Sequence, residues 1–174
     1  MKRATVSGRR ARTRSFSLLE VVIALGVITV GIVGILAVFP TALQTGHSAQ
    51  DETRAAHIAQ SVFGSLAAGA SSQFSNVQLP LYPSPSPAPT PLSINLTTGS
   101  GTTPAVTAYA DNDGNLIPNA TTAAYAIFIY TNNSVPGFTD PASANQVTVR
   151  VASPATAPAA NQTFRDYVRI ISKY

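Results

Sequence analysis

Apolar side chains dominate residues 16–39, where Glu20 is the only charged residue. An α-helix rises about 1.5 Å per residue, so this segment reaches roughly 36 Å, enough to cross a hydrocarbon core about 30 Å thick. A carboxylate inside such a segment is costly and usually has a partner of opposite charge. The pattern therefore predicts a transmembrane helix over residues 16–40. It also predicts that the Glu20 carboxylate has a partner of opposite charge.

The hydrophobic pattern changes at Pro40. Proline lacks an amide proton and disfavours helical backbone at the residue before it, so a helix kink is predicted at Pro40. Beyond it, apolar residues recur near helical spacing: Leu43, Ala55, Ile58, Ala59, Val62 and Leu66. Polar residues occupy the opposite positions. This predicts an amphipathic continuation of the helix over residues 41–70, with one stripe available for burial.

Residues 71–104 contain few periodic apolar positions and many prolines, most of them in the segment LPLYPSPSPAPTP. Prolines at alternate positions cannot supply a ladder of amide donors and favour the polyproline II conformation. The sequence predicts a Pro/Ser-rich loop that serves as a semi-rigid surface connection. A proline-rich ligand for a partner domain is the alternative.

Short runs rich in Val, Ile, Tyr and Thr follow, and they predict a β-sheet domain over residues 105–174. The predicted strands are 105–110, 116–117, 124–131, 146–152 and 166–172. An antiparallel sheet of four or five strands should pack on the amphipathic part of the helix. We therefore expect an α+β fold, in which a long, bent N-terminal helix with a transmembrane first half packs on a small antiparallel sheet.

The net charge of +4 is concentrated at the start of the chain. Residues 1–15 hold six of the eleven Lys and Arg residues, and the remainder has five basic and seven acidic groups, a net charge of −2. The basic balance therefore describes a basic leader peptide and does not indicate a partner nucleic acid. Basic residues beside the first apolar segment stay in the cytoplasm, so the body of the chain is expected on the other side of the membrane.

The sequence offers no constellation typical of catalysis. It has no Gly-rich phosphate loop, no nucleophile–base pair, no paired carboxylates and no cysteine. Residues 111–115, DNDGN, lack the spacing of an EF-hand and predict a turn, with a calcium loop as the alternative. His47 and His57 would lie about 15 Å apart along a helix, too far to share a metal ion. We expect a protein that is not an enzyme and that holds no metal or cofactor.

Residues 14–21, RSFSLLEV, resemble the class III signal of type IV prepilins and type II secretion pseudopilins. The longer stretch LLEVVIALGVITVGIVGILAVFPTAL is similar to minor pilins and pseudopilins, and especially to the prepilin-like group called Verru_Chthon cassette protein B. The resemblance covers about 30 residues of the chain. Two positions depart from the family: Ser15 stands where glycine is strongly preferred, and Pro40 lies slightly later than the kink proline of major pilins.

The resemblance implies that a membrane-embedded prepilin peptidase cleaves the bond between Ser15 and Phe16 and then methylates the new N-terminus at Phe16. Glu20 would become the fifth residue and would serve assembly by neutralising the freed amino group of a neighbouring subunit. The implied function is that of a minor pilin or pseudopilin, a structural subunit of a type IV pilus-like or type II secretion-like filament. Its implied partners are the peptidase, sister subunits and an inner-membrane assembly platform.

The same resemblance implies a single-pass inner-membrane location, with a cytoplasmic N-terminus and a periplasmic or extracellular C-terminal domain, until processing admits the subunit to a filament. Ser15 favours one alternative, an unprocessed single-pass membrane-anchored extracytoplasmic protein. A secreted binding domain is a further alternative. The apolar segment is longer than the usual signal-peptide core of about 7–15 residues, which argues against it.

Overall fold

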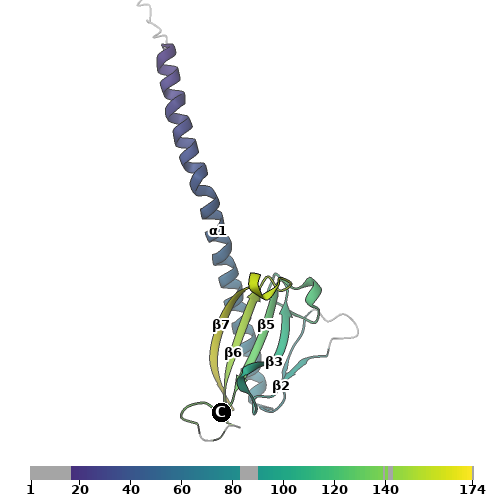
Figure 1. The fold of residues 1–174 in the computed structure, drawn as a ribbon. Helices are drawn as coiled ribbons and strands as arrows, with labels where there is room; N and C mark the ends of the chain where they lie inside the picture. Colours follow the sequence, from purple (N-terminus) through teal and green to yellow (C-terminus); the bar gives the residue numbers. More distant parts are fainter. Residues whose placement is uncertain (1–16, 83–89, 139, 141–142, 174) are drawn as a thin grey trace, which may run out of the picture. The chain divides into compact units, whose positions relative to one another are not determined.

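The computed structural model describes residues 17–82, 90–138, 140 and 143–173 (Figure 1). The basic leader, the bond between Ser15 and Phe16, and Phe16 itself lie outside the described residues. The chain divides into two compact units, the first ending at Gly46 and the second spanning His47–Tyr174. The first unit, as far as it is described, is the apolar helix, and the second holds the rest of that helix and all of the strands.

One helix, α1 (Leu18–Ala70), covers the predicted segments 16–40 and 41–70 from Leu18 onward. The kink at Pro40 stays a prediction, but the proline does not end the helix, which runs through it. In an α-helix a proline removes one amide hydrogen bond, while the neighbouring turns keep theirs. The predicted transmembrane and amphipathic segments are therefore one continuous element of 53 residues.

The buried stripe of α1 begins later than the sequence predicts. Its buried residues are Ala55, Ile58, Ala59, Val62, Phe63, Leu66 and Ala70. Their spacing of three and four residues places them on one face of the helix. Leu43, which the pattern assigned to the same stripe, is 50% exposed. It belongs to the first unit, whose described residues form only helix, so no described element covers it.

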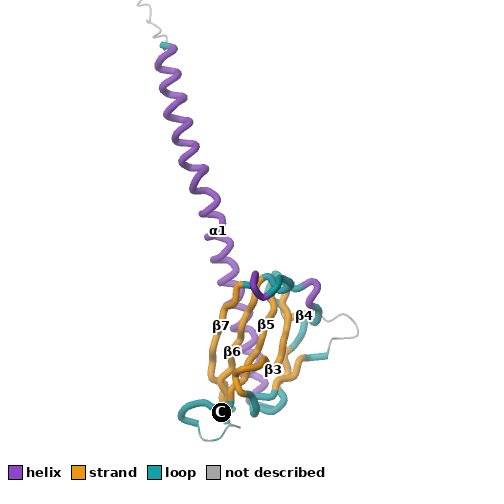
Figure 2. The backbone as a smooth tube through the Cα atoms, in the orientation of Figure 1, coloured by secondary structure: helices purple, strands orange, loops and turns teal. Residues whose placement is uncertain are grey.

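Five strands form one antiparallel sheet in the order β4-β3-β5-β6-β7 (Figure 2). Their bounds are β3 (Ser100–Ala110), β4 (Leu116–Ile117), β5 (Tyr125–Asn132), β6 (Ala144–Ser153) and β7 (Thr163–Ser172). Two 3₁₀ turns, η1 (Ala120–Thr122) and η2 (Ala159–Asn161), lie in the connections before β5 and β7. The predicted α+β class, a long N-terminal helix packed on a small antiparallel sheet, is confirmed and agrees with a pilin-like architecture.

The prediction of a plain loop over residues 71–104 is wrong in part. That segment contains β1 (Val77–Leu79) and β2 (Leu92–Ile94), which pair in an antiparallel two-stranded sheet, and the first residues of β3. Both short strands alternate apolar, polar and apolar residues and bury Val77, Leu79 and Ile94. Three residues are too few for a period of two to stand out among so many prolines.

One hydrophobic core joins the second unit's part of α1, the β1–β2 hairpin and the inner face of the five-stranded sheet. Alternate residues of β5 and β6, such as Ile127 and Val149, point into this core. Asn145 is a fully buried polar residue beside it. Its side chain accepts a hydrogen bond from the Asn132 amide (3.0 Å) and donates one to the Leu96 carbonyl (2.8 Å), so the burial of its amide is compensated.

The two margins of the sheet differ in length and composition. β7 forms one margin and carries charged residues at Arg165, Asp166 and Arg169. At the other margin β4 has only two residues, and β3 contains Pro104, which cannot donate a hydrogen bond. Charges and proline on exposed strands oppose pairing with a strand of another molecule.

The turn predicted at residues 111–115 is confirmed and joins β3 to β4. The Asp111 carboxylate accepts hydrogen bonds from the amides of Asp113 and Asn115 and from the Asn115 side chain. Burial raises the pKa of Asp111, but these bonds together outweigh it, so the pKa lies below its ordinary value. Gly114 has φ of +87°, and a Cβ there would lie 3.2 Å from Ile58, so glycine suits both the turn and its contact with α1.

We predict that Asp111→Asn destabilises the protein near neutral pH by about 0.5–1 kcal/mol, because the turn loses charge-assisted hydrogen bonds at a partly exposed site. The folded state holds the Asp111 pKa low, so charged Asp111 stabilises the fold above about pH 4. That stabilisation is lost as the pH falls through the lower, folded-state pKa. The two proteins should therefore converge in stability in acid.

The measurement is denaturant unfolding of the full chain in detergent at several pH values. Asp113→Asn is the matched control, since Asp113 is exposed in the same turn and joins it through its amide. A stability difference between wild type and Asp111→Asn that stays constant with pH would contradict the role of the carboxylate charge.

Candidate functional site

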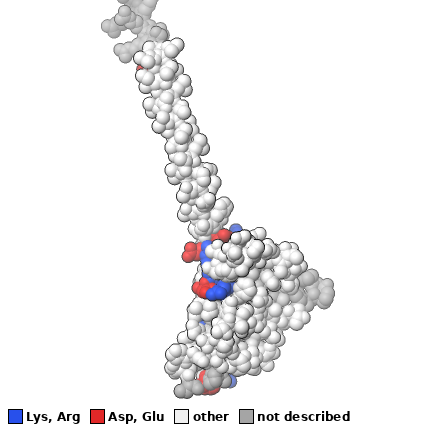
Figure 3. Space-filling model, viewed as in Figure 1, with Lys and Arg blue, Asp and Glu red and all other residues white. Residues whose placement is uncertain are grey.

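The first part of α1 is apolar and uncovered. Every residue from Ser17 to Gln50 is exposed, including large side chains such as Leu18 (83%) and Val30 (74%). Figure 3 shows this stretch of the helix almost without charged atoms. Among the described residues, α1 is the one helix long and apolar enough to cross a membrane. An apolar surface of this extent needs lipid or other protein around it.

A serine caps the start of α1. The Glu20 amide donates hydrogen bonds to the side-chain oxygen (3.2 Å) and to the carbonyl (3.0 Å) of Ser17, and the Val21 amide also donates to that carbonyl (3.3 Å). The first amides of a helix lack partners within it, so a serine at this position stabilises the end. Ser17 and Glu20 also have the spacing of a capping box, a signal by which sequence reasoning could have placed the helix start.

Glu20 lies in the first turn of α1 and is exposed. A carboxylate there interacts favourably with the helix dipole, which is positive at its N-terminal end. This interaction is modest, and the sequence supplies no Lys or Arg between Ser17 and Thr53. The exposed stretch of α1 itself therefore supplies no Lys or Arg as a partner for Glu20.

Two threonine hydroxyls in the exposed stretch of α1 have acceptors on the helix itself. Thr29 donates to the Leu25 carbonyl at 2.7 Å, and Thr45 donates to the Thr41 carbonyl at 2.9 Å. A hydroxyl that bonds to the preceding turn needs no water, so neither side chain prevents the helix from entering a hydrocarbon layer.

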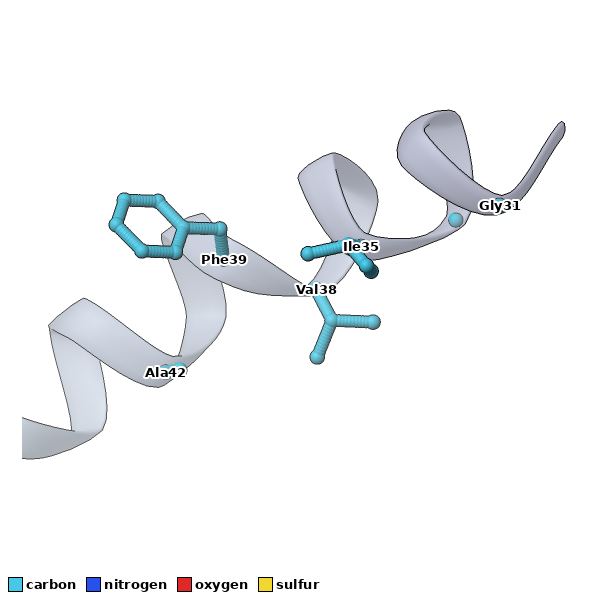
Figure 4. A pocket seen from close by; sticks show the side chains of 6 residues that line it. Gly31, Ile35, Val38, Phe39 and Ala42 are labelled. Atoms are coloured by element: carbon cyan, nitrogen blue, oxygen red, sulfur yellow. The ribbon is translucent and has the colours of Figure 1, made fainter. Parts of the chain in front are cut away.

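A shallow hollow of about 460 Å³ lies on this apolar stretch (Figure 4). It is lined by Gly31, Gly34, Ile35, Val38, Phe39 and Ala42. A Cβ at Gly31 or Gly34 would meet nothing within 4 Å, so packing within the described chain does not require either glycine. Each glycine costs about 1 kcal/mol of helix propensity relative to alanine in water. In membrane helices, small residues at such positions let a second helix approach closely.

In the second unit, a polar side chain of α1 has a partner on the sheet. Tyr125 of β5 donates a hydrogen bond to the Asp51 carboxylate at 3.3 Å, which links the helix to the sheet. Burial and then Asp51 raise the pKa of Tyr125 despite the opposing effect of Arg54.

His47 and His57 are both exposed, and no group of three or more potential metal ligands occurs in the part of the chain that the structure describes.

The residues predicted for processing and assembly thus fall in three places. Ser15 and Phe16 lie outside the described residues, Glu20 occupies the first turn of α1, and Pro40 lies within α1 next to the hollow. Sequence reasoning missed the cap at Ser17. Comparisons with known protein families, with curated proteins and with solved structures found no match.

We predict that Ser17→Ala frays the first turn of α1, because the Glu20 amide loses its side-chain acceptor. Loss of such a cap typically costs about 0.5–2 kcal/mol, which corresponds to a several-fold faster hydrogen exchange of the capped amide. The measurement is NMR hydrogen exchange of the Glu20 amide in lipid nanodiscs. Ser17→Thr keeps a capping hydroxyl and is the control. Equal exchange rates in wild type and Ser17→Ala would show that the cap is not used in lipid.

Proposed function

We propose that the chain is a structural subunit of a type IV pilus-like or type II secretion-like filament, a minor pilin or pseudopilin processed by prepilin peptidase. The observation that carries the proposal is the uncovered apolar stretch of α1 with one glutamate in its first turn. Directly before it stands the segment RSF, where the resemblance places cleavage between Ser15 and Phe16. Anchor, acidic residue and processing signal occur together within about 30 residues.

Charge balance supports a role for processing. Before cleavage, a leader with six basic residues precedes the helix; after cleavage it is gone and Phe16 carries a free amino group. That group would enter the apolar environment only four residues from Glu20 in sequence. An ammonium and a carboxylate at similar depth relieve each other's desolvation, whereas either one alone costs several kcal/mol. In a fibre the pair would form between neighbouring subunits and would fix their axial register.

Helix packing supports the same proposal. The uncovered stretch of α1 includes the hollow beside Gly31 and Gly34, which gives a neighbouring helix room to approach. The folded second unit keeps its own core, so subunits could pack through their helices without unfolding. In this proposal the anchor that holds the subunit in the inner membrane later forms the centre of the filament.

One specific observation favours a second candidate, an anchored extracytoplasmic protein that is never processed. Ser15 replaces the glycine preferred before the cut, so the peptidase would meet a larger side chain at the scissile bond. Both candidates place the leader in the cytoplasm and the sheet domain outside, because the basic residues precede the helix. They differ at the N-terminus of the mature protein and in whether it enters a filament.

The N-terminus of the protein from its native cells distinguishes the candidates. We predict a mass and first residue that correspond to N-methylated Phe16, and accumulation of the full-length chain when the prepilin peptidase is inactivated. Ser15→Gly should be cleaved at least as completely as the wild type. An intact Met1 in wild-type cells together with cleaved Ser15→Gly would support the unprocessed anchor, and a start beyond residue 40 would support secretion.

We predict that Glu20→Gln leaves membrane insertion intact and lowers incorporation into filaments at least tenfold. Removing one member of a buried ion pair costs about 3–5 kcal/mol, and about 1.4 kcal/mol corresponds to a factor of ten. The measurement compares the protein in the sheared filament fraction with that in the membrane fraction. Glu52→Gln is the matched control, because Glu52 is an exposed acid on the same helix in the second unit. Normal incorporation of Glu20→Gln would rule out the charge pair.

A further inference from the structure

The outer face of the five-stranded sheet presents aromatic and polar side chains to solvent. Alternate residues of the strands point away from the core, and within the described chain no helix covers them. Pairing aligns Tyr130 of β5 with Thr148 of β6, and Arg150 of β6 with Asp166 of β7. This surface plays no part in the proposed assembly through α1.

Arg150 of β6 has partners on both neighbouring strands of this face. Its Nε and Nη2 each donate a hydrogen bond of 2.7 Å to Asp166, one to each carboxylate oxygen. The guanidinium carbon lies 5.5 Å from the ring centre of Tyr130 and 5.7 Å from that of Phe164. The hydrogen bonds from Arg150 outweigh burial and hold the Asp166 pKa below its ordinary value, so the pair stays ionised around neutral pH. Four side chains from three strands thus fix one another's positions.

A hollow of about 210 Å³ lies beside this group, lined by Gly101, Thr102, Tyr130, Thr148 and Arg150. Its shape follows from β3, whose pairing with β5 shifts register twice between Ser100 and Val106. Such bulges bend a strand away from its partner. Gly101 contributes to the bend with φ of +75°, and a Cβ there would lie 3.4 Å from Asn132.

The lining combines three chemical features. Tyr130 offers an aromatic ring, Thr102 and Thr148 offer hydroxyls, and Arg150 offers N–H groups beyond the two that Asp166 occupies. The Thr102 hydroxyl is already 2.7 Å from that of Ser100, so it is oriented by a neighbour. The volume is below the roughly 300 Å³ of sites for drug-sized ligands, which limits an occupant to one small ring.

We propose that this hollow binds a single neutral sugar ring, such as the terminal residue of a surface glycan. One face of a pyranose carries C–H groups that stack on an aromatic ring, and its hydroxyls can bond with the arginine and the threonines. Because Asp166 neutralises Arg150, the site has no net positive charge to attract an anion. A purely apolar ligand would leave the hydroxyls and N–H groups of the lining without partners.

The experiment uses the full chain in lipid nanodiscs, which avoids detergents with sugar head groups. Saturation-transfer NMR is recorded with the methyl glycosides of galactose, glucose, mannose and N-acetylglucosamine, and with glucose 6-phosphate as the anionic probe. We expect at least one neutral glycoside to bind saturably, and Thr148→Val and Tyr130→Leu each to weaken that binding by about tenfold. Thr148→Val keeps a β-branched side chain of similar shape, so it tests the hydroxyl without disturbing the strand.

Phe138→Leu is the matched control, because Phe138 is an exposed ring (48%) outside the five strands. Retained binding in this variant, with loss in the other two, supports the proposal. The absence of saturable binding by all four glycosides would overturn it. Binding that survives both Thr148→Val and Tyr130→Leu, or tighter binding of glucose 6-phosphate than of the neutral sugars, would overturn it as well. Each readout is independent of processing and of filament assembly.

Discussion

The central constraint on this molecule is an apolar helical stretch that no described part of the chain covers. From Ser17 to Gln50 every side chain of α1 is exposed, whereas from Ala55 onward the same helix buries a regular stripe in a core. Hydrophobic association near 25 °C scales with the apolar area removed from water, so such a stretch cannot remain in water. A lipid bilayer, or the packed helices of the proposed filament, would provide an apolar environment for these residues.

The sequence predicted most of the fold because its strongest signals are long. The apolar run and the helical stripe extend over many residues, and the strands β5, β6 and β7 are long enough for alternation to be visible. The β1–β2 hairpin escaped prediction because each strand has three residues among prolines. Leu43 was assigned to the buried stripe because periodicity reports a face of a helix and not the point where a partner begins.

The candidate sites also differ in how far the sequence alone could predict them. Glu20 could be singled out from sequence because a lone charge in an apolar run is conspicuous. The group formed by Tyr130, Arg150, Phe164 and Asp166 could not, since it depends on the pairing of three strands that sequence alone did not order. Asn145 is similar: its two hydrogen bonds reach β5 and the segment after β2, and neither partner is local in sequence.

The margins of the sheet have a consequence for crowding. If copies of the chain gather in a membrane or in the proposed filament, their local concentration rises far above that of a freely diffusing protein. At high local concentration, exposed edge strands can pair with the edge strands of neighbouring molecules and lead to aggregation. The charges of β7, the brevity of β4 and Pro104 in β3 make that pairing unfavourable, so neighbouring sheet domains can touch without fusing into a larger sheet.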